Sequence, residues 1–437
     1  MIKSNDIQQP PQPLLGGRLM KLMRLMRLMR PIGLIGLIGL IGLIGCSKDA
    51  EDSVYSEAGA VVEVMGYVSG FDEVDEGTRA YEGRTNRAWI PPSGYYLEPS
   101  MADLPISIFF TQTSGAPEGG YEEEFFFKRN DKWYVSKNLK KETYYLYGYI
   151  PHDNSITASV STLPVEDEIA KTFADGAVLT LANMPTVTTS DFCVVVGAKN
   201  GKGYYKANED YTVTGLKTGL FTYEAEPTEA DGETPKGENY VFLLFDHLYS
   251  AIRFRIKVYG DYNALRTIKL KGLSLQAFTG EDGEVPTPRK MNAIITLKGN
   301  TDGNSPISDI TFVASGTEVG KGDFHENPAG EELGTDFKTF QGHFISYINE
   351  INGEGEKIKK GVTHLRLTSK YDVYDKKGNL IRKDCEATNK LNLTELFSGQ
   401  ESARPGCRYT INLTIQPTYL YMLSEPDLDN PTVKVGQ

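Results

Sequence analysis

Residues 252–258 read IRFRIKV, a strict alternation of apolar and charged side chains. Residues 408–415, RYTINLTI, repeat the alternation with tyrosine, isoleucine and leucine on one side and polar residues on the other. Successive side chains of an extended strand point to opposite faces, so a period of two predicts one buried and one solvated face. The two stretches therefore predict half-buried β-strands.

The same period of two recurs through most of the chain. Gly272 interrupts the alternation between Leu270 and Leu273, which predicts a β-bulge or a strand end there. Helical periodicity is scarce, and short helices are expected only at residues 166–174 and 393–397. Further strands are predicted at residues 106–111, 124–128, 133–136, 143–150, 192–196, 293–298, 310–314 and 365–374.

Turns rich in glycine, proline, asparagine and aspartate separate these strands, without regular alternation of strands and helices. That pattern predicts an all-β fold of antiparallel β-sandwiches with few short helices. Residues 224–238, EAEPTEADGETPKGE, are acidic and broken by proline and glycine, and predict a long loop or an interdomain linker. The expected division is a signal segment at residues 1–45, an N-terminal domain at 46–230 and a C-terminal domain at 231–437.

Composition limits the function classes. The chain has 437 residues, enough for more than one hydrophobic core, and its formal net charge is -12. A phosphate-binding surface needs clustered lysine and arginine, and none stands out after residue 46, so nucleic acid is not an expected partner. Apolar residues make up 40% of the chain, which is typical of a folded protein and not of a disordered one.

The first 46 residues have the layout of a lipoprotein signal peptide. A basic stretch at residues 21–30, KLMRLMRLMR, precedes an uncharged apolar run at residues 32–45 that is shorter than the ~20 residues a membrane-spanning helix needs. The run ends in LIGC, the pattern that precedes a lipid-modified cysteine. We expect Cys46 to carry the lipid that holds the mature chain at the outer membrane, and the acidic residues in SKDAED after it favour the outer face.

The sequence contains none of the local motifs of common catalytic or nucleotide-binding sites. HExxH, GxSxG, GxxxxGKS/T and CxxC are absent, so we expect no enzymatic activity, no cofactor and no metal site. His247 is expected to be a turn or cap residue, and His364 is expected on a solvated face. Beyond the lipidated residue, either Cys385 and Cys407 pair or these two and Cys193 all remain thiols.

Five segments of the chain are distinctive when taken together. They are the lipobox ending in Cys46, GTRA at 77–80, YYLYGYIP at 144–151, FDHLYSAIRFRI at 245–256 and PGCRYTINLTIQPTYLYMLSEPDLDNPT at 405–432. Through them, nearly the whole mature chain resembles one known family, the fimbrillins, which are the subunits and accessory proteins of the type V pili of Bacteroides-like bacteria. The resemblance implies two transthyretin-like β-sandwich domains, export as a surface lipoprotein and assembly into a pilus with other subunits.

The resemblance also implies how such a subunit assembles. A trypsin-like surface protease cuts after an arginine and removes the N-terminal strand together with its lipid, and a strand from another subunit then enters the open groove. In this sequence GTRA puts the cut between Arg79 and Ala80, with Arg84 and Arg87 as alternative positions.

The strand to be removed is expected at residues 60–68, within a removable segment at about 58–79. Val62, Val64 and Val68 lie on one face of the period-two run GAVVEVMGYVSG. They are therefore the expected occupants of the groove.

In the family the donor strand comes from the C-terminal extension. Residues 418–423 are expected to continue the strand that begins at residue 408, and Pro417 marks a break because it cannot donate a ladder hydrogen bond. The ending SEPDLDNPTVKVGQ departs from simple alternation, which leaves shaft, tip and anchor subunits as alternatives. The alternative function is a surface glycan-binding lipoprotein. Host or bacterial surface ligands are expected as further partners of a pilus subunit.

Overall fold

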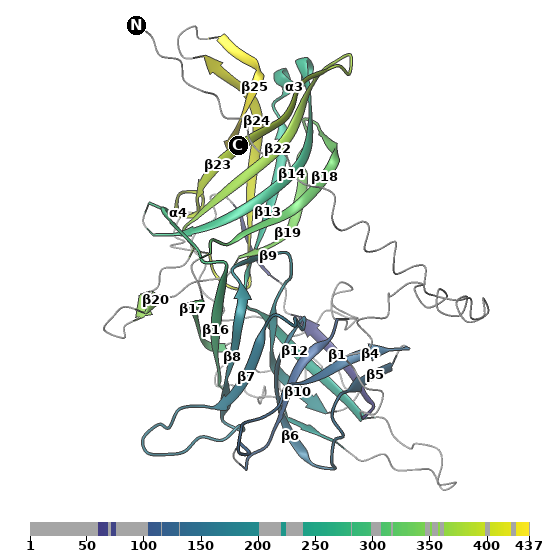
Figure 1. Ribbon diagram of the computed structural model, residues 1–437, viewed down its shortest axis with the longest axis vertical. Coiled ribbons are helices and arrows are strands. Elements are labelled where there is room, and N and C mark those ends of the chain that lie inside the picture. Colours follow the sequence, from purple (N-terminus) through teal and green to yellow (C-terminus); the bar gives the residue numbers. More distant parts are fainter. Residues whose placement is uncertain are drawn as a thin grey trace, which may run out of the picture. The chain divides into compact units, whose positions relative to one another are not determined.

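The described part of the chain is almost entirely β-strand (Figure 1), so the predicted all-β class is confirmed. Within that part the helices are α3 Gly260–Leu265 and α4 Leu393–Leu396. No helix in the described ranges is long and apolar enough to cross a membrane. The computed structural model describes residues 60–68, 71–75, 104–200 except 115 and 131, 220–223, 239–298 except 281, 307–345 except 316 and 317, 350–351, 357–358, 362–397, 403–420 and 425–436.

The first two sheets each combine strands from both halves of the sequence. The first runs, in order, β1 Val62–Val68, β12 Asn239–His247, β10 Cys193–Asn200, β6 Thr143–Ile150, β3 Ile106–Thr111, β4 Glu124–Arg129 and β5 Lys132–Val135, with β11 Leu220–Thr222 paired to β6. The second runs β17 Ile307–Ala314, β16 Lys290–Lys298, β8 Gly176–Pro185 and β7 Thr157–Thr162. In these sheets β12, β16 and β17 follow residue 230 and pair with strands that precede it. The predicted domain boundary at residues 230 and 231 stays a prediction.

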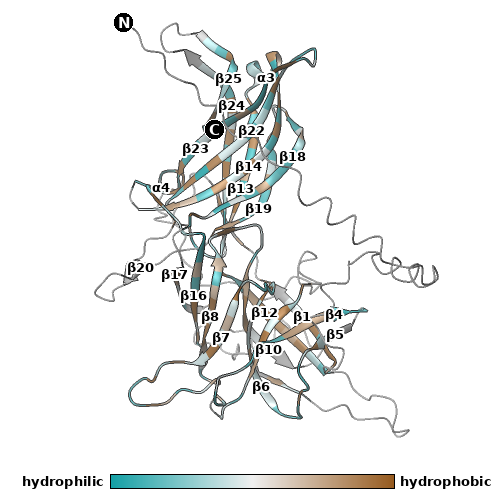
Figure 2. Cartoon of the chain, in the orientation of Figure 1, coloured by the Kyte–Doolittle hydropathy of each residue, from teal (hydrophilic) through white to brown (hydrophobic). Residues whose placement is uncertain are grey.

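The first sheet is buried on both faces. In β6, Tyr147 and Tyr149 enter a core shared with β8 and β16, whereas Tyr144, Leu146 and Ile150 enter a second core. The strands β10, β12 and β3 divide their side chains between the same two cores. This burial explains why β12, NYVFLLFDH, is nearly continuous in apolar residues and largely brown in Figure 2.

The remaining strands enclose a third core. One sheet runs β2 Asp72–Asp75, β24 Cys407–Leu420, β13 Ser250–Val258, β19 Lys338–Ile345 and β9 Val187–Thr188, with β25 Glu425–Val435 paired to β24. The other runs β15 Val285–Pro286, β14 Arg266–Thr279, β22 His364–Asp375 and β23 Leu380–Asn392, with β18 Lys321–Leu333 paired to β14. A further short pair joins β20 Glu350–Ile351 to β21 Lys357–Ile358. Inward side chains of β13, β14, β22 and β24 fill the core, as the alternation in residues 252–258 and 408–415 predicts.

Most predicted strands are confirmed, and β3 and β6 have the predicted bounds. The register of β14 shifts between Leu270 and Gly272, which confirms the predicted bulge, and α4 confirms the helix predicted at residues 393–397. The helix predicted at residues 166–174 is wrong. Asp167 and Glu168 have positive φ angles of 51° and 63°, which end any helical run and make a turn.

Two further expectations concern the cysteines and His364. The described cysteines Cys193, Cys385 and Cys407 remain thiols, so of the two alternatives the one without a Cys385–Cys407 pair holds. His364 is 5% exposed and not on a solvated face. The turn that contains Gly283 packs directly on its imidazole ring, which explains the burial.

Candidate functional site

The N-terminal strand β1 closes the first sheet. It pairs in parallel with β12, from Val62 opposite Asn239 to Val68 opposite Phe245. On the other side its start meets β5, where the amide of Val135 donates to the carbonyl of Ala60 at 3.0 Å. The strand therefore fills the space between β12 and β5, the two ends of the remaining sheet.

The three predicted groove occupants point into the core behind this strand. Val62, Val64 and Val68 are 0%, 5% and 6% exposed and pack with apolar side chains of β3, β10 and β12. Glu63, between them, is exposed. Burial of one such valine stabilises the folded state by about 1.5–3 kcal/mol. The predicted alternation of this strand is thus confirmed, while its removal stays a prediction.

The same N-terminal segment continues into the second half of the molecule as β2. This strand pairs in parallel with β24, from Asp72 opposite Cys407 to Asp75 opposite Thr410. The Glu73 carboxylate accepts hydrogen bonds from Arg253 at 2.8 Å and from Arg408 at 2.9 Å. Both ion pairs are partly exposed, so they orient the segment more than they stabilise it.

Phe71, between β1 and β2, anchors the turn from one sheet to the other. Its ring stacks on the imidazole of His247 with 3.7 Å between ring centroids, and the Arg408 guanidinium lies 4.8 Å from its centroid. The sequence analysis missed Phe71 and Glu73, because FDEVD is too short and too acidic to stand out as a strand. Its two apolar residues, Phe71 and Val74, are three positions apart and give no period-two signal.

The C-terminal extension occupies the same edge of β24 as β2. The strand β24 reaches Leu420, which confirms that the strand continues past Pro417, and its register with β25 shifts between Pro417 and Thr418 as expected of a break. The C-terminal ending is itself a strand, β25, paired antiparallel to residues 413–420. Its departure from simple alternation therefore reflects a strand that is mostly half-buried or exposed and packs on the core through Leu428, Val433 and Val435.

The predicted processing residues lie outside the described part of the chain. This applies to Cys46, to Arg79 and Ala80, and to the alternative positions Arg84 and Arg87. The predicted linker at residues 224–238 is also outside it. The roles of these residues stay predictions.

A cluster that the sequence analysis did not anticipate lies where β10 begins and β12 ends. His247 is not a turn or cap residue; it is the last residue of β12, is 3% exposed and stands directly opposite Cys193. Its Nδ1 lies 3.3 Å from Cys193 Sγ and 2.9 Å from an oxygen of Asp191. Cys193 and His247 are 54 positions apart in the sequence, and only the pairing of β10 with β12 brings them together. Spacing in the sequence therefore gives no signal.

These features define an all-β protein whose N-terminal segment completes one sheet and extends another. No sequence-family profile matches the chain, and no curated protein matches it. Several solved structures from Bacteroidales match the chain at low identity and low TM-score.

A candidate cell-adhesion protein from Bacteroides fragilis is 7% identical with a TM-score of 0.33, over 86% of this chain and 97% of that one. A fimbrial protein from Bacteroides vulgatus is 14% identical with a TM-score of 0.33, over 86% and 98%. The fimbrial anchor protein Mfa2 from Porphyromonas gingivalis is 9% identical with a TM-score of 0.24, over 85% and 96%. At these values the function of this chain has to be inferred from its own residues.

Proposed function

We propose that this chain is a subunit of a fimbrillin-type surface pilus, exported as a lipoprotein through Cys46 and assembled by exchange of its N-terminal strand. The observation that carries the proposal is the position of β1. A strand from near the start of the mature chain fills a sheet between β12 and β5 and buries three valines in the core behind it. Because β1 precedes all the other described strands in the chain, it can be removed without a cut in any of them.

In the proposed sequence of events, the lipid on Cys46 holds the chain at the outer membrane until a protease cuts between Arg79 and Ala80. Both β1 and β2 precede that cut and leave together. Their departure exposes the edge of β12, the core lined by β3 and β10, and the edge of β24 at residues 407–410. An incoming strand is then held by backbone hydrogen bonds, and its alternate side chains fill the vacated valine pockets.

The proposed donor is the C-terminal strand β25. Most of its residues are exposed or half-buried, and its pairing with β24 is interrupted at Pro417. Detachment of β25 therefore exposes little apolar surface to water. Detached, it provides an extended segment for the groove of the next subunit. The proposal makes other copies or related subunits the partners, and it leaves shaft, tip and anchor positions open.

The test is limited trypsin treatment of the mature protein, followed by N-terminal sequencing, intact-mass measurement and electron microscopy. We expect cleavage after Arg79 with the rest of the chain intact, and then oligomers or filaments. The matched control is Arg79→Gln, with Arg84→Gln and Arg87→Gln tested separately to locate the cut. Cleaved protein that stays monomeric would contradict self-assembly and favour an anchor or tip position, or a different function.

A cavity in the first sheet's half of the molecule favours a second candidate function, glycan binding at the cell surface. It has a volume of about 350 Å³ and is lined by aromatic, amide and carboxylate side chains, a combination suited to sugars. Binding of oligosaccharides by the purified protein, abolished by Tyr121→Ala, would support this candidate. The lining includes Phe110, Gln112, Tyr121, Lys140, Glu142 and Tyr144.

A further inference from the structure

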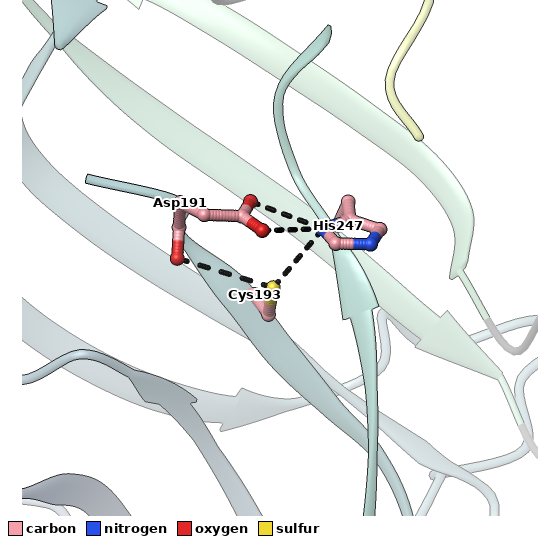
Figure 3. A group of neighbouring side chains, drawn as sticks. All are labelled: Asp191, Cys193 and His247. Atoms are coloured by element: carbon pink, nitrogen blue, oxygen red, sulfur yellow. Dashed lines mark hydrogen bonds and ion pairs between the residues drawn. The ribbon is translucent and has the colours of Figure 1, made fainter. Parts of the chain in front are cut away.

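The cluster of Asp191, Cys193 and His247 brings three different ligand types to one point. Figure 3 shows the carboxylate and the thiol approaching the same edge of the imidazole ring. The carboxylate oxygens lie 2.9 and 3.0 Å from His247 Nδ1, the thiol sulfur lies 3.3 Å from it, and the three ligand atoms are all within 4.8 Å of one another.

This arrangement does not suit a nucleophilic cysteine. In a catalytic triad the histidine uses one ring nitrogen toward the nucleophile and the other toward the carboxylate. Here Asp191 and Cys193 both contact Nδ1 of His247. In addition, Cys193 is 0% exposed, so no substrate carbonyl reaches its sulfur.

A thiol and a carboxylate that both approach one ring nitrogen do suit a metal ion. One ring nitrogen offers either one proton or one lone pair, so it cannot bond well to both a thiol and a carboxylate. An ion between the three groups would be bonded to all of them. In tetrahedral zinc sites, bonds of about 2.0–2.3 Å put ligand atoms roughly 3.3–3.8 Å apart. The distances from Nδ1 to the carboxylate and to the sulfur therefore need to lengthen by only a few tenths of an ångström.

The surroundings of the cluster hold the ligands in place. The backbone amide of His247 donates to the Asp246 carboxylate at 2.9 Å, and Phe71 stacks on the face of the imidazole. An ion at Nδ1 lies in the plane of the ring, so the stacked Phe71 leaves that position open. The Asp191 side chain is 12% exposed, so an ion would enter the site past Asp191.

We propose that Asp191, Cys193 and His247 form a binding site for a divalent ion of the zinc class. A thiolate, an imidazole and a carboxylate are ligands that zinc combines in proteins, and the thiolate disfavours calcium and magnesium. On binding, the Cys193 thiol releases its proton to solvent and its sulfur bonds the ion. The ion would join the start of β10 to the end of β12, the strand against which β1 packs.

The test uses the metal-free mature protein and Co²⁺ as a spectroscopic substitute for Zn²⁺. We expect one Co²⁺ per chain, with a thiolate-to-cobalt charge-transfer band that added Zn²⁺ removes. Cys193→Ser should lose the band. Cys385→Ser, which changes a half-buried thiol outside the cluster, should keep it.

A second measurement does not depend on the variants folding normally. Excess Zn²⁺ should raise the thermal unfolding midpoint of the unmodified protein, because a ligand that binds only the folded state stabilises it. The proposal is overturned if the unmodified protein shows neither the band nor a raised midpoint, in which case hydrogen bonds alone hold the cluster. It is also overturned if Cys385→Ser loses the band and Cys193→Ser keeps it.

Discussion

At the scale of single residues, β1 presents two chemically opposite faces within three positions. Val64 is 5% exposed and packs in the core between β1, β3 and β12, whereas Glu63 is exposed. Truncation of neighbouring side chains on this strand should therefore lower the free energy of unfolding by different amounts. Val64→Ala leaves a cavity, and Glu63→Ala removes only a solvated group.

We therefore expect Val64→Ala to lower the free energy of unfolding by about 2 kcal/mol. Glu63→Ala should change it by less than about 0.5 kcal/mol. Urea unfolding of the two variants beside the unmodified chain measures both values. Equal effects of the two substitutions would mean that β1 is not packed as described.

A second residue-scale feature is His343, which is 0% exposed and has no hydrogen-bond partner for either ring nitrogen. Burial lowers the pKa of His343 from 6.5 to about 3. The folded state therefore resists protonation of this ring, while the unfolded chain accepts a proton below pH 6.5. Stability that is fully present above pH 6.5 is lost as the pH falls toward 3.

For this reason, His343→Leu should remove part of the acid sensitivity of the protein. The unmodified chain should lose about 3 kcal/mol at pH 4 through this one residue, and the variant should not. Val64→Ala, a buried change in a different core and without a titratable group, serves as the control because its destabilisation should be the same at pH 7.5 and pH 4. If the variant and the unmodified chain show the same pH dependence between 7.5 and 4, His343 is not the cause.

At the scale of elements, the outer edge of β24 is covered by two segments from opposite ends of the chain. Residues 407–410 pair with β2, and residues 413–420 pair with β25. An uncovered edge strand offers unpaired backbone donors and acceptors to other chains. Each of the two segments therefore also prevents edge-to-edge association.

Deletion of residues 425–437 should accordingly make the uncleaved protein associate. Size-exclusion chromatography with light scattering should show dimers or larger species, whereas deletion of residues 436–437 alone should leave a monomer. The reason is the edge of β24 between Leu413 and Leu420, which only the longer deletion exposes. A monomeric protein after the longer deletion would show that this edge is not adhesive.

The elements also show how far the sequence could predict the fold. The alternation in residues 252–258 identified β13, because each face of that strand meets a constant environment. The aromatic run in residues 143–150 identified β6, whose two faces are both buried. Pro426 and Pro431 disguised β25, and the acidic run around Asp167 imitated a helix that its turn excludes. The parallel pairing of β1 with β12 left no trace in the sequence, because it joins segments about 180 positions apart. The Asp191 cluster stayed hidden for the same reason.

At the scale of the whole molecule, the N-terminal segment connects the two sets of sheets. It contributes β1 to the first sheet, stacks Phe71 on His247 and adds β2 to the edge of β24. Removal of this segment therefore uncovers the edge of β12 and the edge of β24 in one step. The proposed cut after Arg79 would therefore open the edges of β12 and β24 at once, as the proposed strand exchange requires.

The most direct test of this account is whether the removed strand can be replaced. A labelled peptide of residues 60–75 is added to the trypsin-processed protein, and its binding is followed by fluorescence anisotropy. We predict saturable binding of one peptide per chain, which is lost when the peptide carries Val64→Asp and kept when it carries Glu63→Gln. The account would be contradicted if processed protein that remains folded does not bind the unmodified peptide. It would also be contradicted if the Val64→Asp and Glu63→Gln peptides bind equally.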